Sequence, residues 1–133
     1  MRVLAVPAIL VAATLASCGD DTKASGGGSN GPTAALTAAQ RSEMNQLYSA
    51  KQCVMCHPAD GSGSQLGPGL TGIEEDWNEA DLTAFLLDPP GGVAASARLT
   101  DLASGYQMHM PKPAITAEQA ALMARWLLAG RPQ

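Results

Sequence analysis

Aromatic side chains are scarce in this chain of 133 residues, which has only two Trp, two Tyr and one Phe. Large rings usually dominate the burial of a core, so we expect something other than aromatic residues to fill the centre of the fold. Runs of basic residues are also lacking, and the formal net charge is −4. A nucleic-acid partner is therefore not expected, because binding to phosphates depends on clustered Lys and Arg.

The sequence has no apolar run long enough to cross a bilayer as a helix. The longest one, residues 3–15, has thirteen residues, whereas a spanning helix needs roughly 17 to 25. Arg2 precedes this run and small residues follow it, which is the order of a secretory signal peptide. The run ends in Leu-Ala-Ser-Cys at residues 15–18, which resembles a bacterial lipobox.

The lipobox resemblance implies that residues 1–17 are a lipoprotein signal peptide, cut before Cys18. Acyl chains on Cys18 would then anchor the protein to a membrane on its periplasmic, extra-cytosolic side. The alternative is ordinary secretion with Cys18 as an unused thiol. The chain has three cysteines, and an odd cysteine in a secreted protein needs an explanation, which favours lipidation.

Residues 18–36 are small and polar, with the sequence SGGGSNGP at their centre. Such a segment cannot bury enough apolar surface to order itself, so we expect a flexible tether between the lipid anchor and a folded domain at residues 37–133. Within that domain, caps and periodicity predict helices over residues 38–50, 79–87 and 117–129, with a weaker pattern over 96–104. Alternating strand patterns are lacking, which predicts an all-α fold of three to five helices.

The sequence Cys53-Val54-Met55-Cys56-His57 is a C-x-x-C-H motif, the attachment signature of c-type haem. Both thiols form thioethers with one porphyrin, and the histidine is delivered to the iron as its proximal ligand. A thioredoxin-like site would need a βαβ setting, and a zinc site would need four suitably spaced ligands. A structural disulfide would leave the histidine unexplained.

The surroundings of the motif resemble those of the bacterial class I c-type cytochromes. The Leu-Tyr pair at residues 47–48 matches a hydrophobic-aromatic pair of that family, and the Gly-Pro-Gly-Leu segment at residues 67–70 is similar to its G-P-x-L segment. The resemblance implies that Pro68 and Leu70 lie beside the haem. It also implies that the Pro68 carbonyl accepts a hydrogen bond from His57, which orients the ring.

The family takes its second axial ligand, a methionine followed by proline, from the loop before the last helix. This chain has Met108-His109-Met110-Pro111 there. The residue before proline is extended, and side chains of an extended chain alternate sides, so Met108 and Met110 share a side and His109 points away. We expect Met110 to bind the iron and the other methionine to pack against the porphyrin or the core. Met108 is the alternative ligand, followed by His109 or by none.

Several other residues have both a functional and a structural interpretation. Trp77 either donates to a haem propionate, as in several family members, or packs at the edge of the core. Arg98 is expected on a solvated helix, with pairing to a propionate as the alternative, and Trp126 is expected to pack between the first and last helices. Gln52 stands where the family often has glycine. An acidic cluster is expected to be a solvated face, with docking of a basic partner as the alternative: Glu74, Glu75, Asp76, Glu79 and Asp81.

An iron held by His57 and Met110 has no open position and exchanges only one electron. We therefore expect a membrane-tethered, monomeric electron carrier with one covalent haem c and no catalytic residues. Its partners would be membrane-associated redox proteins of a respiratory or other extra-cytosolic pathway. Two alternatives stay open: a peroxidase-like haem enzyme or gas sensor with an open iron, and a fixed electron-entry subunit of a larger complex.

Overall fold

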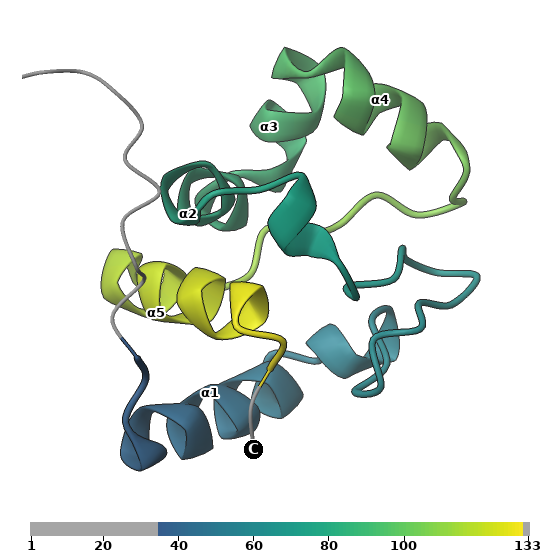
Figure 1. Cartoon of the computed structure of the whole chain (residues 1–133). Helices are drawn as coiled ribbons and strands as arrows, with labels where there is room; N and C mark the ends of the chain where they lie inside the picture. The colour runs from purple at the N-terminus through teal and green to yellow at the C-terminus, as the bar shows by residue number, and fades with distance from the viewer. Residues whose placement is uncertain (1–34, 132–133) are drawn as a thin grey trace, which may run out of the picture.

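The computed structural model describes residues 35–131, which form five α-helices and two short 3-10 helices and contain no strand (Figure 1). The expected all-α fold is therefore confirmed. Within this range no helix is both long and apolar enough to cross a membrane. The elements are, in chain order, α1 (Ala38–Ala50), η1 (Cys53–Met55), η2 (Ile73–Glu75), α2 (Glu79–Leu87), α3 (Pro89–Ala95), α4 (Ala97–Ser104) and α5 (Ala117–Leu128).

The starts of the two longest helices are fixed by the predicted capping boxes. The Thr37 hydroxyl accepts the Gln40 backbone N–H at 3.2 Å, and the Gln40 side chain accepts the Thr37 N–H at 2.9 Å. Thr116 and Gln119 repeat this exchange at 3.2 and 3.0 Å. Reciprocal bonds of this kind satisfy backbone donors that the first helical turn leaves free, so α1 and α5 begin where the sequence predicts.

Helix α3 is the element that sequence patterns did not predict. Pro89 and Pro90 end α2 as expected, but they also occupy the first two positions of α3, where a missing N–H breaks no helical bond. Gly92 lets α3 approach α2 closely, because a Cβ there would lie 2.7 Å from Cδ2 of Phe85. Ser96 then caps α4, which confirms the weaker prediction for residues 96–104.

Helix α5 lies between α1 and α2 and contacts both, while α3 and α4 pack together on the other side of α2 (Figure 1). Ala120 and Ala124 are both 0 % exposed, and their small side chains permit the close approach of the neighbouring helices. The rings of Tyr48 and Trp126 meet where α1 crosses α5, with centroids 5.4 Å apart and planes inclined by 60°. The expected packing of Trp126 between the first and last helices is confirmed.

The hydrophobic core includes one residue before the first helix cap. Leu36, placed at the end of the tether by composition, is only 8 % exposed and belongs to the hydrophobic core. The core therefore includes the residue that directly precedes the Thr37 helix cap. The predicted signal peptide, Cys18 and most of the tether lie outside the described residues.

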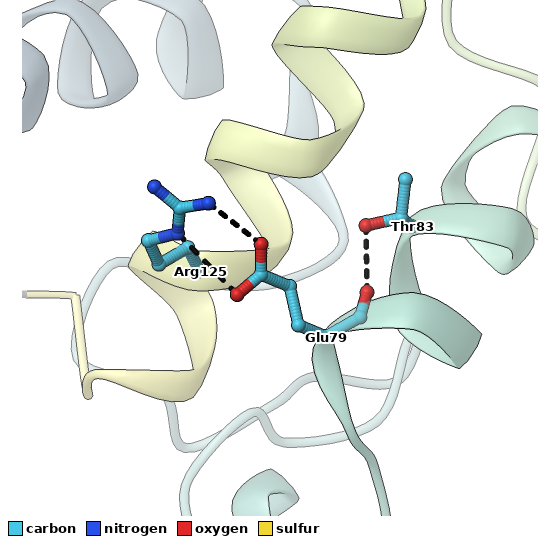
Figure 2. A network of polar contacts seen from close by, with 3 residues as sticks. All are labelled: Glu79, Thr83 and Arg125. Atoms are coloured by element: carbon cyan, nitrogen blue, oxygen red, sulfur yellow. Dashed lines mark hydrogen bonds and ion pairs between the residues drawn. The ribbon is translucent and has the colours of Figure 1, made fainter. Parts of the chain in front are cut away.

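An ion pair joins the first turn of α2 to the last turn of α5 (Figure 2). Arg125 donates to the two carboxylate oxygens of Glu79, from Nη2 at 2.8 Å and from Nε at 3.3 Å. The Thr83 hydroxyl donates to the Glu79 carbonyl at 2.6 Å, within α2. An anion at a helix start and a cation at a helix end both suit the helix dipoles. The assignment of Glu79 to a solvated acidic face is therefore wrong, because its carboxylate forms an ion pair with Arg125 of α5.

Candidate functional site

The candidate site begins where the chain turns sharply after α1. Gln52 has a φ of 60°, a left-handed conformation that glycine adopts without steric cost. Gln52 thus makes the turn that a glycine makes in the family it resembles. The His57 N–H donates to the Cys53 carbonyl at 2.9 Å, so Cys53, Cys56 and His57 share one tight turn.

Cys53 and Cys56 are both free thiols of intermediate exposure. A structural disulfide between them, one of the alternatives for this motif, is not formed. Burial raises the pKa of the Cys53 thiol, with the charge of Cys56 adding to the effect and a backbone hydrogen bond opposing it. Side chains three residues apart on a helical turn lie on the same side, so both sulfur atoms are available to one group.

The His57 imidazole is oriented by the segment that the sequence assigned to this role. Its Nδ1 lies 2.8 Å from the Pro68 carbonyl oxygen. A carbonyl only accepts, so Nδ1 carries the proton and Nε2 keeps its lone pair for a metal. Burial lowers the pKa of His57, while the bond to Pro68 opposes this effect, so the ring is neutral at pH 7. The expected hydrogen bond between His57 and Pro68 is present.

The loop carrying Pro68 lies directly against the attachment turn. A Cβ at Gly67 would lie 3.0 Å from Cε1 of His57 and 3.1 Å from Cβ of Cys56, so this position leaves no room for a side chain. Ser64 ties the two segments together, since its hydroxyl donates to the Cys56 carbonyl and its N–H to the Gly67 carbonyl, both at 2.8 Å. Glycine is needed at residue 67 for this close approach, which the G-P-x-L resemblance did not itself explain.

Two further side chains hold the backbone beside His57, and neither was assigned a role from the sequence. The hydroxyl of Tyr48, a residue only 5 % exposed, donates to the His57 carbonyl. Arg131 donates from Nη1 to the Pro58 carbonyl at 3.3 Å. The family resemblance marked Tyr48 only as part of a hydrophobic-aromatic pair, and a lone arginine after the last helix has no local pattern that marks a site.

The loop between α4 and α5 contributes Met110 to the core but leaves Met108 outside it. Met110 is partly buried and packs against the same hydrophobic cluster as Cys53, Leu70 and Trp77. Met108 is 57 % exposed. The two methionines therefore differ in burial, and of the two it is Met110 that packs against the core. His109 is exposed, as expected.

Trp77 lies at the edge of the core between an aromatic and a cationic side chain. Its ring centroid is 5.1 Å from that of Phe85, and the Arg98 guanidinium carbon lies 5.2 Å from the Trp77 ring. Arg98 also pairs with Asp76 at 3.4 Å on an exposed part of the surface. Among the described residues, none accepts a hydrogen bond from the indole N–H of Trp77. The structure thus supports the edge position of Trp77 and leaves its N–H available to a ligand.

These residues fit a covalently attached haem better than a metal ion held by the protein alone. Within residues 35–131, no group of three or more His, Cys, Asp or Glu side chains could hold a metal ion. Two free thiols on one turn, a neutral histidine with Nε2 available and a half-buried methionine are the ligands of a c-type haem.

The fold and the site define a small all-α domain suited to a haem attached through Cys53 and Cys56. A family model of cytochrome c matches residues 42–130, more than half of the chain. The chain belongs to the cytochrome c family, whose members bind covalently attached haem c, are electron-transfer proteins and are typically extra-cytosolic. Comparison with curated proteins and with solved structures gives no match.

Proposed function

We propose that this protein is a membrane-tethered monohaem cytochrome that carries single electrons for an extra-cytosolic or respiratory oxidoreductase. Cys53 and Cys56 hold the haem through thioethers, and His57 Nε2 and the Met110 sulfur are the axial ligands. Cys18 carries the lipid anchor. Haem c bound in this way supplies a one-electron couple, and two axial ligands leave the iron closed to substrates.

The observation that carries the proposal is the hydrogen bond of 2.8 Å between His57 and Pro68. It holds a proton on Nδ1 and directs the opposite nitrogen away from the loop, on a residue that shares its turn with the two thiols. A second-shell carbonyl of this kind orients the ligand and raises its basicity. Gly67 makes the arrangement tight, and a rigid ligand set favours electron exchange with little rearrangement.

Partial burial favours Met110 over Met108 as the sixth ligand. Met110 already packs against the hydrophobic cluster that includes Leu70 and Trp77, so little further ordering is needed to hold its sulfur near the site. Met108, at 57 % exposed, would have to leave the surface, and ordering a methionine side chain costs up to about 2 kcal/mol. Leu70 and Trp77 shield the site from water, and the Trp77 indole N–H is available to a propionate.

Covalent attachment is tested by mass spectrometry of the denatured protein after expression with a haem-attachment system. The wild type should keep the mass of one haem, and a protein carrying Cys53→Ala and Cys56→Ala should lose it entirely. A matched control is Ser64→Ala, which changes the neighbouring loop and leaves both thiols in place. Wild-type protein with the mass of the polypeptide alone would overturn the proposal.

The sixth ligand is tested by the optical spectrum of the oxidised holoprotein. Met110→Ala should abolish the absorption band at the red end of the spectrum that a methionine–iron bond produces, while Met108→Ala should keep it. Loss of the band in Met108→Ala alone would exchange the two assignments. A wild type without the band would favour an open iron, as in a peroxidase-like enzyme or a gas sensor.

The anchor and the mode of action require cellular experiments. Cys18→Ala should move the protein from the membrane fraction to the soluble extra-cytosolic fraction, and an unchanged distribution would contradict lipidation. A free carrier should dock through small, short-lived interfaces. It should therefore elute as a monomer after mild detergent extraction, whereas stable co-purification with an oxidoreductase would identify it as a fixed subunit.

A further inference from the structure

We propose that Arg131 is a positioning residue that holds the His57 segment against the end of α5 and whose positive charge raises the reduction potential of the site. The inference rests on the proposed function, because it concerns a haem whose iron is bound by His57. Arg131 itself is not an iron ligand. It acts through the backbone that carries the ligand and through its charge.

The backbone at the end of α5 places Arg131 in an unusual conformation. The Gly130 N–H donates to the Leu127 carbonyl at 3.0 Å and the Arg131 N–H to the Trp126 carbonyl at 2.9 Å, the paired bonds of a Schellman motif. Gly130 has a φ of 76°, and Arg131 also has a positive φ, of 57°. A residue with a Cβ is disfavoured there, and such conformations persist where surrounding contacts hold them.

The Arg131 side chain contacts the segment that follows His57. Arg131 Nη1 donates to the carbonyl of Pro58, the residue that follows His57, at 3.3 Å. A Cβ on Gly61 would collide with the guanidinium group, so the buried Gly61, with a φ of 80°, makes room for it. Tyr48 holds the same segment through the His57 carbonyl. The end of α5 and the end of α1 thus brace the two consecutive carbonyls of His57 and Pro58.

The charge of Arg131 lies close to the ligand, because Nη1 is 3.3 Å from the carbonyl oxygen of Pro58, the residue next to His57. Oxidised iron carries one more positive charge than reduced iron, so a nearby fixed cation destabilises the oxidised form. Partial burial weakens the screening of this interaction by salt.

The test is a redox titration of the purified holoprotein at 0.15 M salt. Arg131→Gln should shift the reduction equilibrium toward the oxidised form by about three- to tenfold, and tenfold corresponds to about 59 mV for a one-electron couple. Arg131→Lys keeps the charge and should restore most of the wild-type potential. A purely structural role would not be rescued in this way, because lysine lacks the planar guanidinium group.

The matched control is Arg41→Gln, which removes the same charge from the first turn of α1. Arg41 lies nine residues before Ala50, the last residue of α1, which is about 14 Å along the helix at 1.5 Å per residue and beyond the screening length of about 8 Å. The control should change the equilibrium by less than about 1.5-fold. Equal shifts in Arg41→Gln and Arg131→Gln, or a shift in Arg131→Lys as large as in Arg131→Gln, would overturn the inference.

A variant that avoids misfolding keeps the experiment decisive. Arg131→Gly removes the side chain while glycine adopts the observed φ without strain, so it should fold and lower the potential as Arg131→Gln does. An unchanged potential in Arg131→Gly overturns the inference while leaving the proposed function intact. A wild-type protein that holds no covalent haem overturns the proposed function itself, and the two failures are therefore distinguishable.

Discussion

Tyr48 should make the protein lose stability in alkaline solution between pH 10 and pH 12. Its ring packs against Trp126 with only 5 % of the residue exposed, and its hydroxyl donates to the His57 carbonyl. Burial, together with the charge of Cys53, raises its pKa from 10.0 to about 12, while Arg131 opposes the rise. The folded protein thus keeps the phenol neutral at a pH at which the unfolded chain ionises it.

The sign and size of the effect follow from proton linkage. The folded-state pKa lies above the unfolded value, so the contribution of Tyr48 is fully present below pH 10 and is lost as the pH rises through the folded pKa. One pKa unit corresponds to 1.36 kcal/mol, so a shift from 10.0 to about 12 corresponds to about 2 to 3 kcal/mol. That is a large part of the roughly 5 to 15 kcal/mol by which a typical domain is stable.

The assay is denaturant unfolding of the holoprotein, followed by far-ultraviolet circular dichroism between pH 8 and pH 12. In the holoprotein of the proposed function Cys53 is a thioether and carries no charge, so burial is the main cause that raises the pKa of Tyr48 there and the loss of about 2 to 3 kcal/mol is an upper bound. Tyr48→Phe should lose about 1 kcal/mol near pH 8 with its hydrogen bond but show a much flatter decline above pH 10. Tyr106→Phe, at the less buried second tyrosine, should follow the wild-type curve. A Tyr48→Phe curve parallel to the wild type above pH 10 would refute the reasoning.

Three further substitutions test local features by the same unfolding measurement. Gln52→Gly should stabilise the protein by about 0.5 to 1 kcal/mol. The φ of 60° strains a residue that has a Cβ, and this strain exceeds the extra chain entropy that a glycine loses on folding. A loss of stability would contradict this reasoning. Gly67→Ala should destabilise it by about 1 to 3 kcal/mol, since the added Cβ lies 3.0 Å from Cε1 of His57, and a neutral effect would show that the loop yields. Glu79→Gln should lower the free energy of unfolding by about 0.5 to 1 kcal/mol. The same substitution should lower it much less in a protein that already carries Arg125→Met, because the ion pair is then already absent.

Local signals in the sequence were sufficient to predict most of the α-helices and the grouping of Cys53, Cys56 and His57. Capping boxes are short-range exchanges between residues three apart, so Thr37 and Thr116 reveal helix starts without knowledge of the fold. The C-x-x-C-H motif is equally local, and it predicts the close grouping of Cys53, Cys56 and His57. Helix α3 was not predicted, because Pro89 and Pro90 indicate the end of one helix but also occupy the first turn of the next.

Contacts between distant parts of the chain could not be predicted in the same way. Arg131 and Pro58 are 73 residues apart, and no periodicity links an arginine after a helix end to a carbonyl beside a motif. The role of Gly67 depends on the approach of two loops, which only the folded chain brings together. Leu36 is a similar case, because it follows a polar segment in the sequence but is buried in the core. Composition describes the average of a segment, whereas burial depends on the contacts of each side chain.

The two methionines show why burial has to be added to a pattern before a ligand is assigned. Alternation in an extended chain places Met108 and Met110 on one side, so the pattern alone ranks them only by the proline that follows Met110. In the structure Met110 packs against the core, whereas Met108 is 57 % exposed. A ligand must hold one position through both oxidation states, and a side chain already ordered by packing loses less entropy in doing so. The assignment of Met110 therefore rests on two independent grounds, the neighbouring proline and the anchored side chain.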